Sequence, residues 1–271
     1  MTNTISEAVI LMAGSGSRLR RAGENRLKPL LCFLGRPLIS HTLDALAKAG
    51  IRTVYAVVGF EGRSLRAEVA PLIPSRIQIC WIDNPDWQKQ NGISALAAAP
   101  HVTAPFLLTM GDHLFEQSIA DLLLRETNPK ELIVAIDKKL DAVFDLDDAM
   151  KVQMQGDHII AIAKDLQNYN AIDTGVFICP REFFDYLEKA KSRRGGSDCS
   201  LADGVRLMAE EGAVRGIDIG DAWWQDIDTP EMLANAEKDL RSRHGHLAMA
   251  NTRSECGNTA ENQTDDRNRK P

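Results

Sequence analysis

Residues 8–19, Ala-Val-Ile-Leu-Met-Ala-Gly-Ser-Gly-Ser-Arg-Leu, decide the fold. The apolar run 8–13 has the length and branching of a strand buried on both faces. It leads directly into Gly14-Ser15-Gly16-Ser17, whose glycines allow a tight turn and let backbone N–H groups approach an anion. Arg18 follows at once, and Lys28 comes ten residues later. Backbone donors beside two cations suit a polyphosphate, so this stretch predicts a nucleotide-binding turn between a strand and a helix.

Two better-known phosphate loops differ from this stretch. A dinucleotide fingerprint needs another glycine three residues after Gly16, where this sequence has Leu19. It also needs an acid about 20 residues further on, where this sequence has Arg36. The Gly-Lys-Ser/Thr signature of a P-loop is absent. A glycine turn without a ligand would leave Arg18 and Lys28 unexplained, so nucleotide binding is the stronger interpretation.

Composition narrows the class of protein. The chain has 271 residues, of which 44% are hydrophobic and 26% charged, as in ordinary globular proteins. A net charge of −6 argues against a nucleic-acid partner held by a basic face. The sequence lacks the pattern of a secretory leader and any apolar run long enough to span a membrane. Its five widely spaced cysteines are typical of reduced thiols, so we expect a cytoplasmic protein without membrane insertion.

The order of expected elements predicts an α/β fold. Strands alternate with helices as far as about residue 110, which indicates a Rossmann-like, mostly parallel sheet with helices on both faces. From residue 132 short antiparallel pieces follow, including a hairpin that turns at 155–157. We expect residues 132–180 to form a small antiparallel lid that binds a second substrate. The expected single domain spans 1–242, and the polar composition of 243–271 predicts a disordered tail.

Acidic residues follow two expected strands far apart in the sequence. Asp112 comes just after the apolar strand 106–110, at the edge where open α/β sheets bind ligands. Asp226 and Asp228 are two positions apart on an extended segment, so their carboxylates face the same side. We interpret all three as ligands of Mg²⁺ at a polyphosphate. The alternative for Asp112 is a cap on the following helix.

The polar connection 84–94 joins the third strand to an alanine-rich helix. Its amides could read the edge of a base, and Ser94 could contact the ligand. A plain loop with a helix cap explains the same residues nearly as well.

Several of these stretches resemble the nucleotidyltransferases that load a phosphorylated small molecule onto a nucleotide. The resemblance extends to about residue 240 and is closest to cytidylyltransferases of the CTP:inositol-1-phosphate type. It departs from the usual motif at Met12, where alanine is common. The matching stretches are Leu11-Met12-Ala13-Gly14, the 84–94 connection, Asp112-His113-Leu114-Phe115, Lys164-Asp165-Leu166, Ala171-Ile172-Asp173-Thr174-Gly175 and Asp226-Ile227-Asp228-Thr229-Pro230.

The resemblance implies roles for individual residues. Arg18 and Lys28 would be catalytic, with Asp112, Asp226 and Asp228 holding Mg²⁺. The nucleotide would contact Met12, Ala13, Gly14, Ser15, Gly16, Ser17, Asn91, Gly92 and Ser94. The second substrate, or acceptor, would contact Lys164, Asp173 and Thr174.

The implied reaction transfers a cytidylyl group from CTP to a phosphorylated alcohol and releases pyrophosphate. Inositol 1-phosphate is the first expectation for the alcohol. Sugar 1-phosphates, phosphocholine and aminoethylphosphonate are alternatives, because enzymes acting on such compounds share the first and last motifs. A nucleotide-binding regulator without turnover is the alternative of a different class. We expect a monomer or a homodimer.

Overall fold

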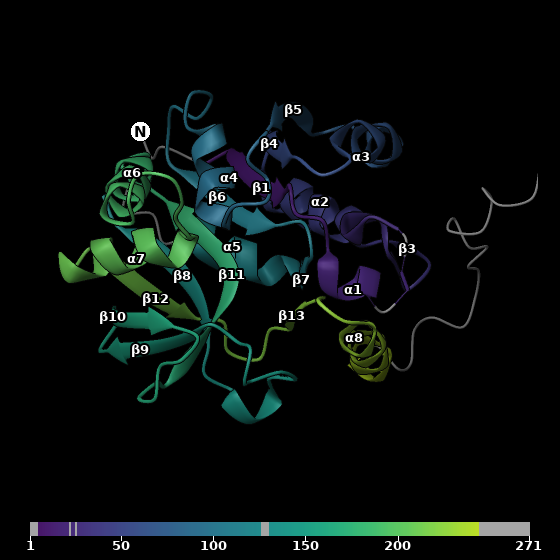
Figure 1. Ribbon diagram of the computed structural model, residues 1–271. Coiled ribbons are helices and arrows are strands. Elements are labelled where there is room, and N and C mark those ends of the chain that lie inside the picture. Colours follow the sequence, from purple (N-terminus) through teal and green to yellow (C-terminus); the bar gives the residue numbers. More distant parts are fainter. Residues whose placement is uncertain (1–4, 22, 25, 126–129, 244–271) are drawn as a thin grey trace, which may run out of the picture.

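The computed structural model describes residues 5–243 except 22, 25 and 126–129. A nine-stranded mixed sheet runs through these residues in the order β5-β4-β1-β6-β11-β8-β12-β10-β9. Figure 1 shows this sheet between two groups of helices. The expected α/β class, with a mixed sheet covered on both faces, is confirmed.

The first half of the sheet is parallel and is built as expected. Its strands are β1 (Glu7–Met12), β4 (Thr53–Val58), β5 (Gln78–Asp83) and β6 (Phe106–Met110). β1 is buried on both faces because its neighbours β4 and β6 flank it and helices cover it above and below. Its alternate side chains therefore enter different cores, with Val9 and Leu11 in one and Ala8 and Ile10 in the other.

Each core is closed by its own set of helices. Apolar residues at helical spacing, such as Leu43 and Leu46 of α2, turn toward the strands, and polar residues face out. One face is covered by α2 (Leu38–Ala49), α3 (Gly62–Val69) and α5 (Gln117–Arg125). The other face is covered by α4 (Asn91–Ala98), α6 (Phe183–Arg193) and α7 (Leu201–Glu210).

The second half of the sheet contains the expected antiparallel strands. These are β8 (Leu132–Asp137), β9 (Lys151–Gln155), β10 (His158–Ala163) and β11 (Ala171–Cys179). A further strand, β12 (Val214–Asp218), lies outside the expected range and pairs parallel with β8 and antiparallel with β10. β9 and β10 form the expected hairpin. β11, however, lies inside the main sheet, antiparallel to both β6 and β8, and it also pairs with β9. These five strands thus close a ring of pairings, and only the hairpin extends away from the parallel half.

A short second sheet positions the late part of the chain. β7 (His113–Phe115) pairs antiparallel with β13 (Trp224–Asp226), so that His113 stands opposite Asp226. α8 then begins at Pro230 and ends at Arg243, and the Thr229 hydroxyl caps it by accepting a bond from the Met232 N–H at 3.2 Å. Thr229 is therefore the N-cap of α8.

The remaining described elements are short. They are α1 (Ser17–Arg21), β2 (Cys32–Phe33), β3 (Arg36–Pro37) and the 3₁₀ turns η1 (Lys28–Leu30), η2 (Ala70–Leu72) and η3 (Leu140–Ala142). In the part of the chain that the structure describes, no helix has the length and apolar composition needed to cross a membrane. The expected disordered tail, 243–271, lies outside the described residues except for Arg243.

Candidate active site

The glycine-rich loop 13–16 connects the end of β1 to α1. Gly16 has a φ of +63°, which other residues rarely adopt, and a Cβ there would lie 3.3 Å from the Lys28 Cβ. Burial of Leu27 and Leu30 on either side of Lys28 anchors η1 against the second core. The absent side chain of Gly16 and this anchoring together bring Lys28 against the loop.

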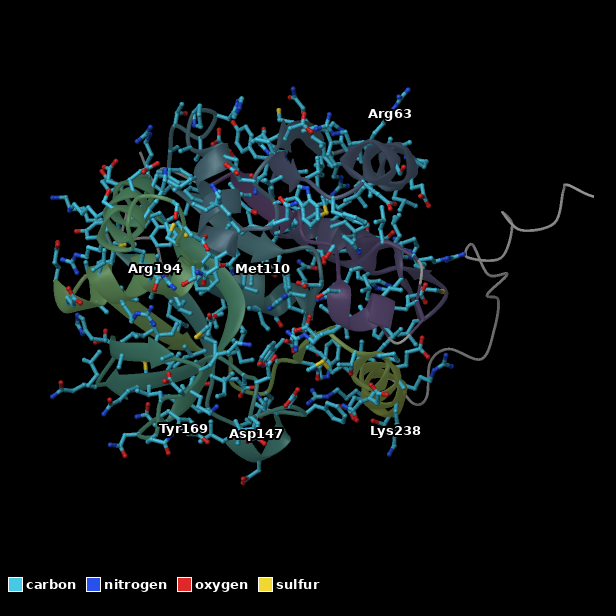
Figure 2. All side chains as sticks on the ribbon, viewed as in Figure 1. Arg63, Met110, Asp147, Tyr169, Arg194 and Lys238 are labelled. Atoms are coloured by element: carbon cyan, nitrogen blue, oxygen red, sulfur yellow. The ribbon has the colours of Figure 1, made fainter. Side chains whose placement is uncertain are left out.

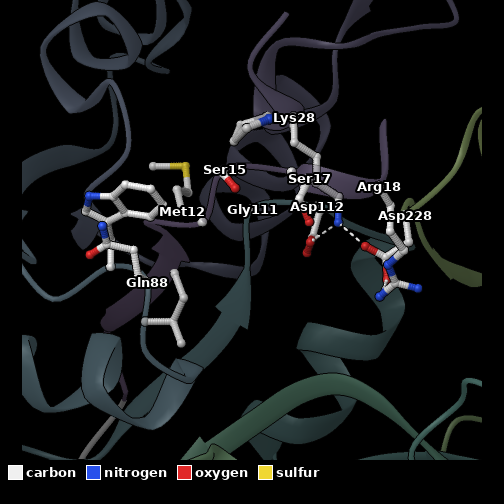
Figure 3. A pocket seen from close by; sticks show the side chains of 14 residues that line it. Met12, Ser15, Ser17, Arg18, Lys28, Gln88, Gly111, Asp112 and Asp228 are labelled. Atoms are coloured by element: carbon white, nitrogen blue, oxygen red, sulfur yellow. Dashed lines mark hydrogen bonds and ion pairs between the residues drawn. The ribbon is translucent and has the colours of Figure 1, made fainter. Parts of the chain in front are cut away.

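The loop forms one wall of a cavity of about 490 Å³, which we call pocket 1 (Figure 3). Other walls come from Trp87 and Gln88 in the 84–94 connection and from the acids Asp112 and Asp228. The predicted nucleotide-binding residues on its lining are Met12, Gly14, Ser15, Gly16 and Ser17. Ala13 is not on the lining, because it is buried and its carbonyl accepts a bond from the Phe60 N–H at 3.0 Å.

Lys28 joins the two acid sites. Its ammonium lies 2.5 Å from Asp112 Oδ2 and also donates to Asp228 Oδ1 (Figure 3). Burial alone would lower the pKa of Lys28, but the charges of Asp112 and Asp228 outweigh it and raise that pKa. Burial likewise opposes ionisation of Asp112, yet Lys28 and then His113 hold the pKa of that carboxyl well below its ordinary value. Lys28 and Asp112 are therefore charged near neutral pH.

Pairing of β7 with β13 brings the late acids to the early one. The Ile227 N–H donates to the Asp112 carbonyl at 3.0 Å, which fixes Asp226 and Asp228 on either side of that bond. Burial raises the pKa of Asp226, and nearby Asp228 and Asp112 raise it further while His113 opposes them. The convergence expected from sequence is present, although the acids lie more than a hundred positions apart.

The oxygen donors here suit a hard divalent ion such as Mg²⁺. Among the described residues, no group of three or more His, Cys, Asp or Glu side chains is arranged to hold a metal ion. At polyphosphates Mg²⁺ takes one or two carboxylates and completes its shell with phosphate oxygens and water. Asp112 and Asp228 are then carboxylates that Lys28 neutralises in this structure.

His113 is held firmly beside Asp112. Its Nδ1 lies 2.7 Å from Asp112 Oδ1. Gly175 has a φ of +75°, and a Cβ there would lie 2.3 Å from His113 Cδ2, so only glycine lets the ring occupy this place. Burial would lower the pKa of His113, but the Asp112 charge outweighs it and raises that pKa. His113 thus orients Asp112 rather than acting as a free base.

Arg18, in α1 directly after the glycine-rich loop, contacts acids on the opposite side of the site. Its Nη2 lies 2.7 Å from Asp228 Oδ2, and its Nη1 lies 2.6 Å from Asp148 Oδ2. Asp148 also contacts Lys164, whose Nζ lies 2.5 Å from Oδ1. Burial opposes the effect, but the bonds from Lys164 and Arg18 lower the pKa of Asp148. Sequence reasoning missed Asp148, because nothing distinguishes it from its acidic neighbours in 141–148.

A second cavity of about 440 Å³, pocket 2, lies on the side of the antiparallel strands and shares Asp112 and Asp228 with pocket 1. Lys164 and Asp173, predicted to bind the acceptor, line it. Burial raises the pKa of Asp173 to about 6, although the Gly175 N–H donates to it at 2.7 Å. The structure does not bring Thr174 to this pocket. Thr174 is fully buried and its hydroxyl donates to the Ala135 carbonyl at 2.9 Å.

The predicted residues of the 84–94 connection lie in different places. Asn91 lines pocket 2, and its Oδ1 accepts from the Leu201 N–H at 2.9 Å at the start of α7. Gly92 faces the backbone of Cys199, where a Cβ would lie 2.6 Å from the carbonyl oxygen. Ser94 is buried and accepts from Asn84 Nδ2 at 2.9 Å. Gly92 and Ser94 are therefore packing positions in this structure.

Residues 8–203 match the MobA-like NTP transferase domain. The chain belongs to this family. The match contains the glycine-rich loop, Lys28, Asp112, Asp148 and Lys164, and ends before Asp226. The expected nucleotidyltransferase resemblance is confirmed.

The similarity to curated relatives extends beyond the 8–203 match, toward the end of the chain. A protein named "Bifunctional IPC transferase and DIPP synthase" from Rubrobacter xylanophilus is 32% identical over 85% of this chain and 51% of its own length. A protein of the same name from Aquifex aeolicus is 29% identical over 87% of this chain and 52% of its own. The chain thus spans about half the length of these curated relatives.

Solved structures share the fold. The inositol-1-phosphate CTP transferase from T. maritima superposes with a TM-score of 0.78 at 26% identity, covering 92% of this chain and all of that one. A putative glucose-1-phosphate thymidylyltransferase from Bacillus anthracis superposes with a TM-score of 0.75 at 21% identity, over 87% of this chain and 95% of its own. That second likeness speaks for the fold alone.

Proposed function

We propose that this protein transfers a cytidylyl group from CTP to inositol 1-phosphate, forms a CDP-alcohol and releases pyrophosphate. One observation carries the proposal: a pocket on the glycine-rich loop and a second pocket with several carboxylates on its wall meet at Asp112 and Asp228. A transfer between two phosphorylated substrates needs two adjoining sites with cations and acids at the boundary. The named relatives and the superposed CTP transferase support the choice of CTP and inositol phosphate.

The reaction is an in-line displacement at phosphorus. An oxygen of the acceptor phosphate attacks the α-phosphorus of CTP, the bond from that phosphorus to the bridging oxygen breaks, and pyrophosphate leaves. The N–H groups of the glycine-rich loop and Arg18 hold the departing pyrophosphate. Lys28 neutralises the two phosphates that must approach each other, which would otherwise repel. No covalent intermediate with the protein is required.

We further propose that Asp112 and Asp228, with Asp226 beside them, hold Mg²⁺. When bound, this ion supplies charge neutralisation at the reacting phosphate oxygens. Gly175 and His113 keep Asp112 in place, and the β7–β13 pairing keeps Asp226 and Asp228 opposite it. These residues therefore provide a fixed set of carboxylates at the boundary of the two pockets.

Pocket 2 favours an acceptor rich in hydroxyl groups. Carboxylates on its wall accept hydrogen bonds from several hydroxyls at once, as a polyol offers them. The same acidic wall attracts a cationic head group, so phosphocholine and aminoethylphosphonate form the second candidate class. Its carboxylates are those of Asp112, Asp145, Asp148, Asp173, Asp226 and Asp228.

The test is a pyrophosphate-release assay with Mg²⁺ and each of CTP, UTP, ATP and GTP. Each nucleotide is paired with inositol 1-phosphate, glucose 1-phosphate, phosphocholine and aminoethylphosphonate, and products are identified by mass spectrometry. We expect release with CTP and inositol 1-phosphate and a product with the mass of CDP-inositol. Pyrophosphate release with another nucleotide and acceptor pair would show that the proposed substrates are wrong. Binding of CTP without release for any acceptor would favour the nucleotide-binding regulator.

A further inference from the structure

Asp148 forms ion pairs with one cation of each pocket. It pairs at 2.6 Å with Arg18, which follows the glycine-rich loop, and at 2.5 Å with Lys164, which lies in the turn after β10. The segment around it is ordered by its own bonds, since the Ala149 N–H donates to the Asp145 carbonyl at 3.1 Å and Lys151 Nζ to the Asp147 carbonyl at 3.2 Å. The carboxylate is therefore held facing the two cations.

The Arg18–Asp148 pair crosses the boundary between the pockets. Arg18 lines pocket 1 and Asp148 lines pocket 2, while neither lines the other cavity. An acceptor phosphate in pocket 2 must reach a nucleotide phosphate in pocket 1. The cations that would receive these phosphates, Arg18 and Lys164, are thus already paired with Asp148, and the pair with Arg18 crosses the boundary.

Arg18 cannot keep both of its carboxylates and also bind phosphate with its full guanidinium fork. Each of its two terminal nitrogens now contacts a different acid, Asp148 and Asp228. End-on bidentate recognition of a phosphate, with both terminal nitrogens on one partner, would compete with both of these contacts. A phosphate arriving beside Asp148 would also meet a like charge. Both acids keep a lysine partner if Arg18 leaves, Lys28 for Asp228 and Lys164 for Asp148, and Asp148 is the more exposed of the two, so we take Asp148 as the contact to exchange.

We propose that Asp148 is a built-in anion that pairs with Arg18 and Lys164 until substrate phosphate takes its place. The inference rests on the proposed function, because it assigns the incoming phosphates to the two pockets. Every phosphate ligand must first displace the carboxylate, which lowers its apparent affinity. Asp148 thereby acts through Arg18 and Lys164 as a positioning residue: it keeps both cations aimed at the boundary until the substrates arrive.

The experiment measures pyrophosphate binding by titration calorimetry at constant Mg²⁺ concentration. Asp148→Asn removes the competing charge with little change in shape. The matched control is Asp147→Asn, which removes the same charge from the same segment at an exposed position on the outside of the molecule (Figure 2). Asp148→Glu, which retains a carboxylate, tests whether the charge rather than the shape matters.

We expect Asp148→Asn to bind pyrophosphate about fivefold more tightly than the wild type, the worth of one exposed ion pair. Asp147→Asn and Asp148→Glu should stay within about twofold of the wild type. Unchanged or weaker binding by Asp148→Asn would overturn the exchange, and so would a wild type that binds no pyrophosphate. A tighter Asp148→Asn variant together with no release from any nucleotide and acceptor pair would support the exchange and contradict only the transfer reaction.

Discussion

Lys28 and Asp228 form an ion pair across 200 positions of the sequence, and the same ammonium pairs with Asp112. The lysine side chain is only 11% exposed, and the two carboxylates are 26% and 21% exposed. The buried Lys28 ammonium therefore links three segments of the chain. They are η1, which carries the lysine, the turn after β6 and the turn after β13. Electrostatics at the site and the arrangement of the chain around it depend on the same contacts.

Replacing Lys28 with alanine should lower kcat by roughly two orders of magnitude or more, as loss of a fixed electrostatic stabiliser does. The reason is that Lys28 is the cation between Asp112 and Asp228 among the described residues that line pocket 1. The other cation on this lining, Arg18, lies at the edge of the pair and contacts Asp228. Steady-state pyrophosphate release measures the effect, and circular dichroism checks the fold. Lys48→Ala, an exposed change in α2, is the control. Near-normal turnover of Lys28→Ala would remove the lysine from the mechanism.

Asp112→Asn and Asp226→Asn should each abolish most activity, while the double variant should be little worse than either single one. Residues that serve one shared ligand are not independent, so their losses do not add. Asp228→Asn should be damaging as well. The measurement is kcat/KM for all variants at saturating Mg²⁺, with exposed Asp185→Asn as the control. Losses that simply multiply, or turnover that persists in excess chelator, would contradict a common metal.

Gly175→Ala should destabilise the protein and reduce turnover. The new Cβ would come within 2.3 Å of His113 Cδ2 and force the ring away from Asp112. Gly156→Ala is the matched control, since Gly156 has a similar φ of +64° but open space around it. Both variants should lose about 1 kcal/mol or more to backbone strain. Only Gly175→Ala should lose further stability and activity, measured by urea unfolding and pyrophosphate release. Equal effects would mean that the contact with His113 is unimportant.

Stability should depend on pH through Asp173. Burial raises its pKa to about 6 in the folded protein, above the ordinary 3.8, so the folded state holds this proton more tightly than the unfolded state. Its stabilising contribution is full below about pH 4, falls as pH rises to about 6, and is lost above that.

Asp173→Asn keeps an oxygen for the Gly175 N–H and removes the titration. Relative to wild type, the variant should gain stability as pH rises from about 4 to 6, by roughly 3 kcal/mol at most. Urea unfolding of both proteins across this range provides the comparison. A difference that does not change with pH would contradict the raised pKa.

Much of the fold could be predicted from local signals. The apolar run 8–13 has no polar side, and a strand without a polar side must be covered on both faces, as β1 is. The hairpin of β9 and β10 and the capped start of α8 at Thr229 also follow from a few adjacent residues. The candidate site could be predicted in the same way where acids follow strands.

Pairing between distant segments could not be predicted from the sequence. β11 has the apolar composition of any buried strand, and nothing in it specifies that it enters the sheet antiparallel between β6 and β8. Its register decides that Asp173 faces pocket 2 while the next residue, Thr174, turns to Ala135, because neighbouring side chains in a strand point to opposite faces. The acceptor prediction for Thr174 depended on this register.

The sequence by itself determined the phosphate loop, because the conformational freedom of Gly16 and the charges of Arg18 and Lys28 are properties of the residues. It also led to the prediction that Asp112, Asp226 and Asp228 converge, because their positions after strands are local signals. Only the tertiary structure decided which charges meet. Ion pairs such as Arg18–Asp148 and Lys28–Asp228 depend on strand register and loop geometry over a hundred residues or more, and Coulomb attraction acts only once folding has brought those charges within a few ångströms.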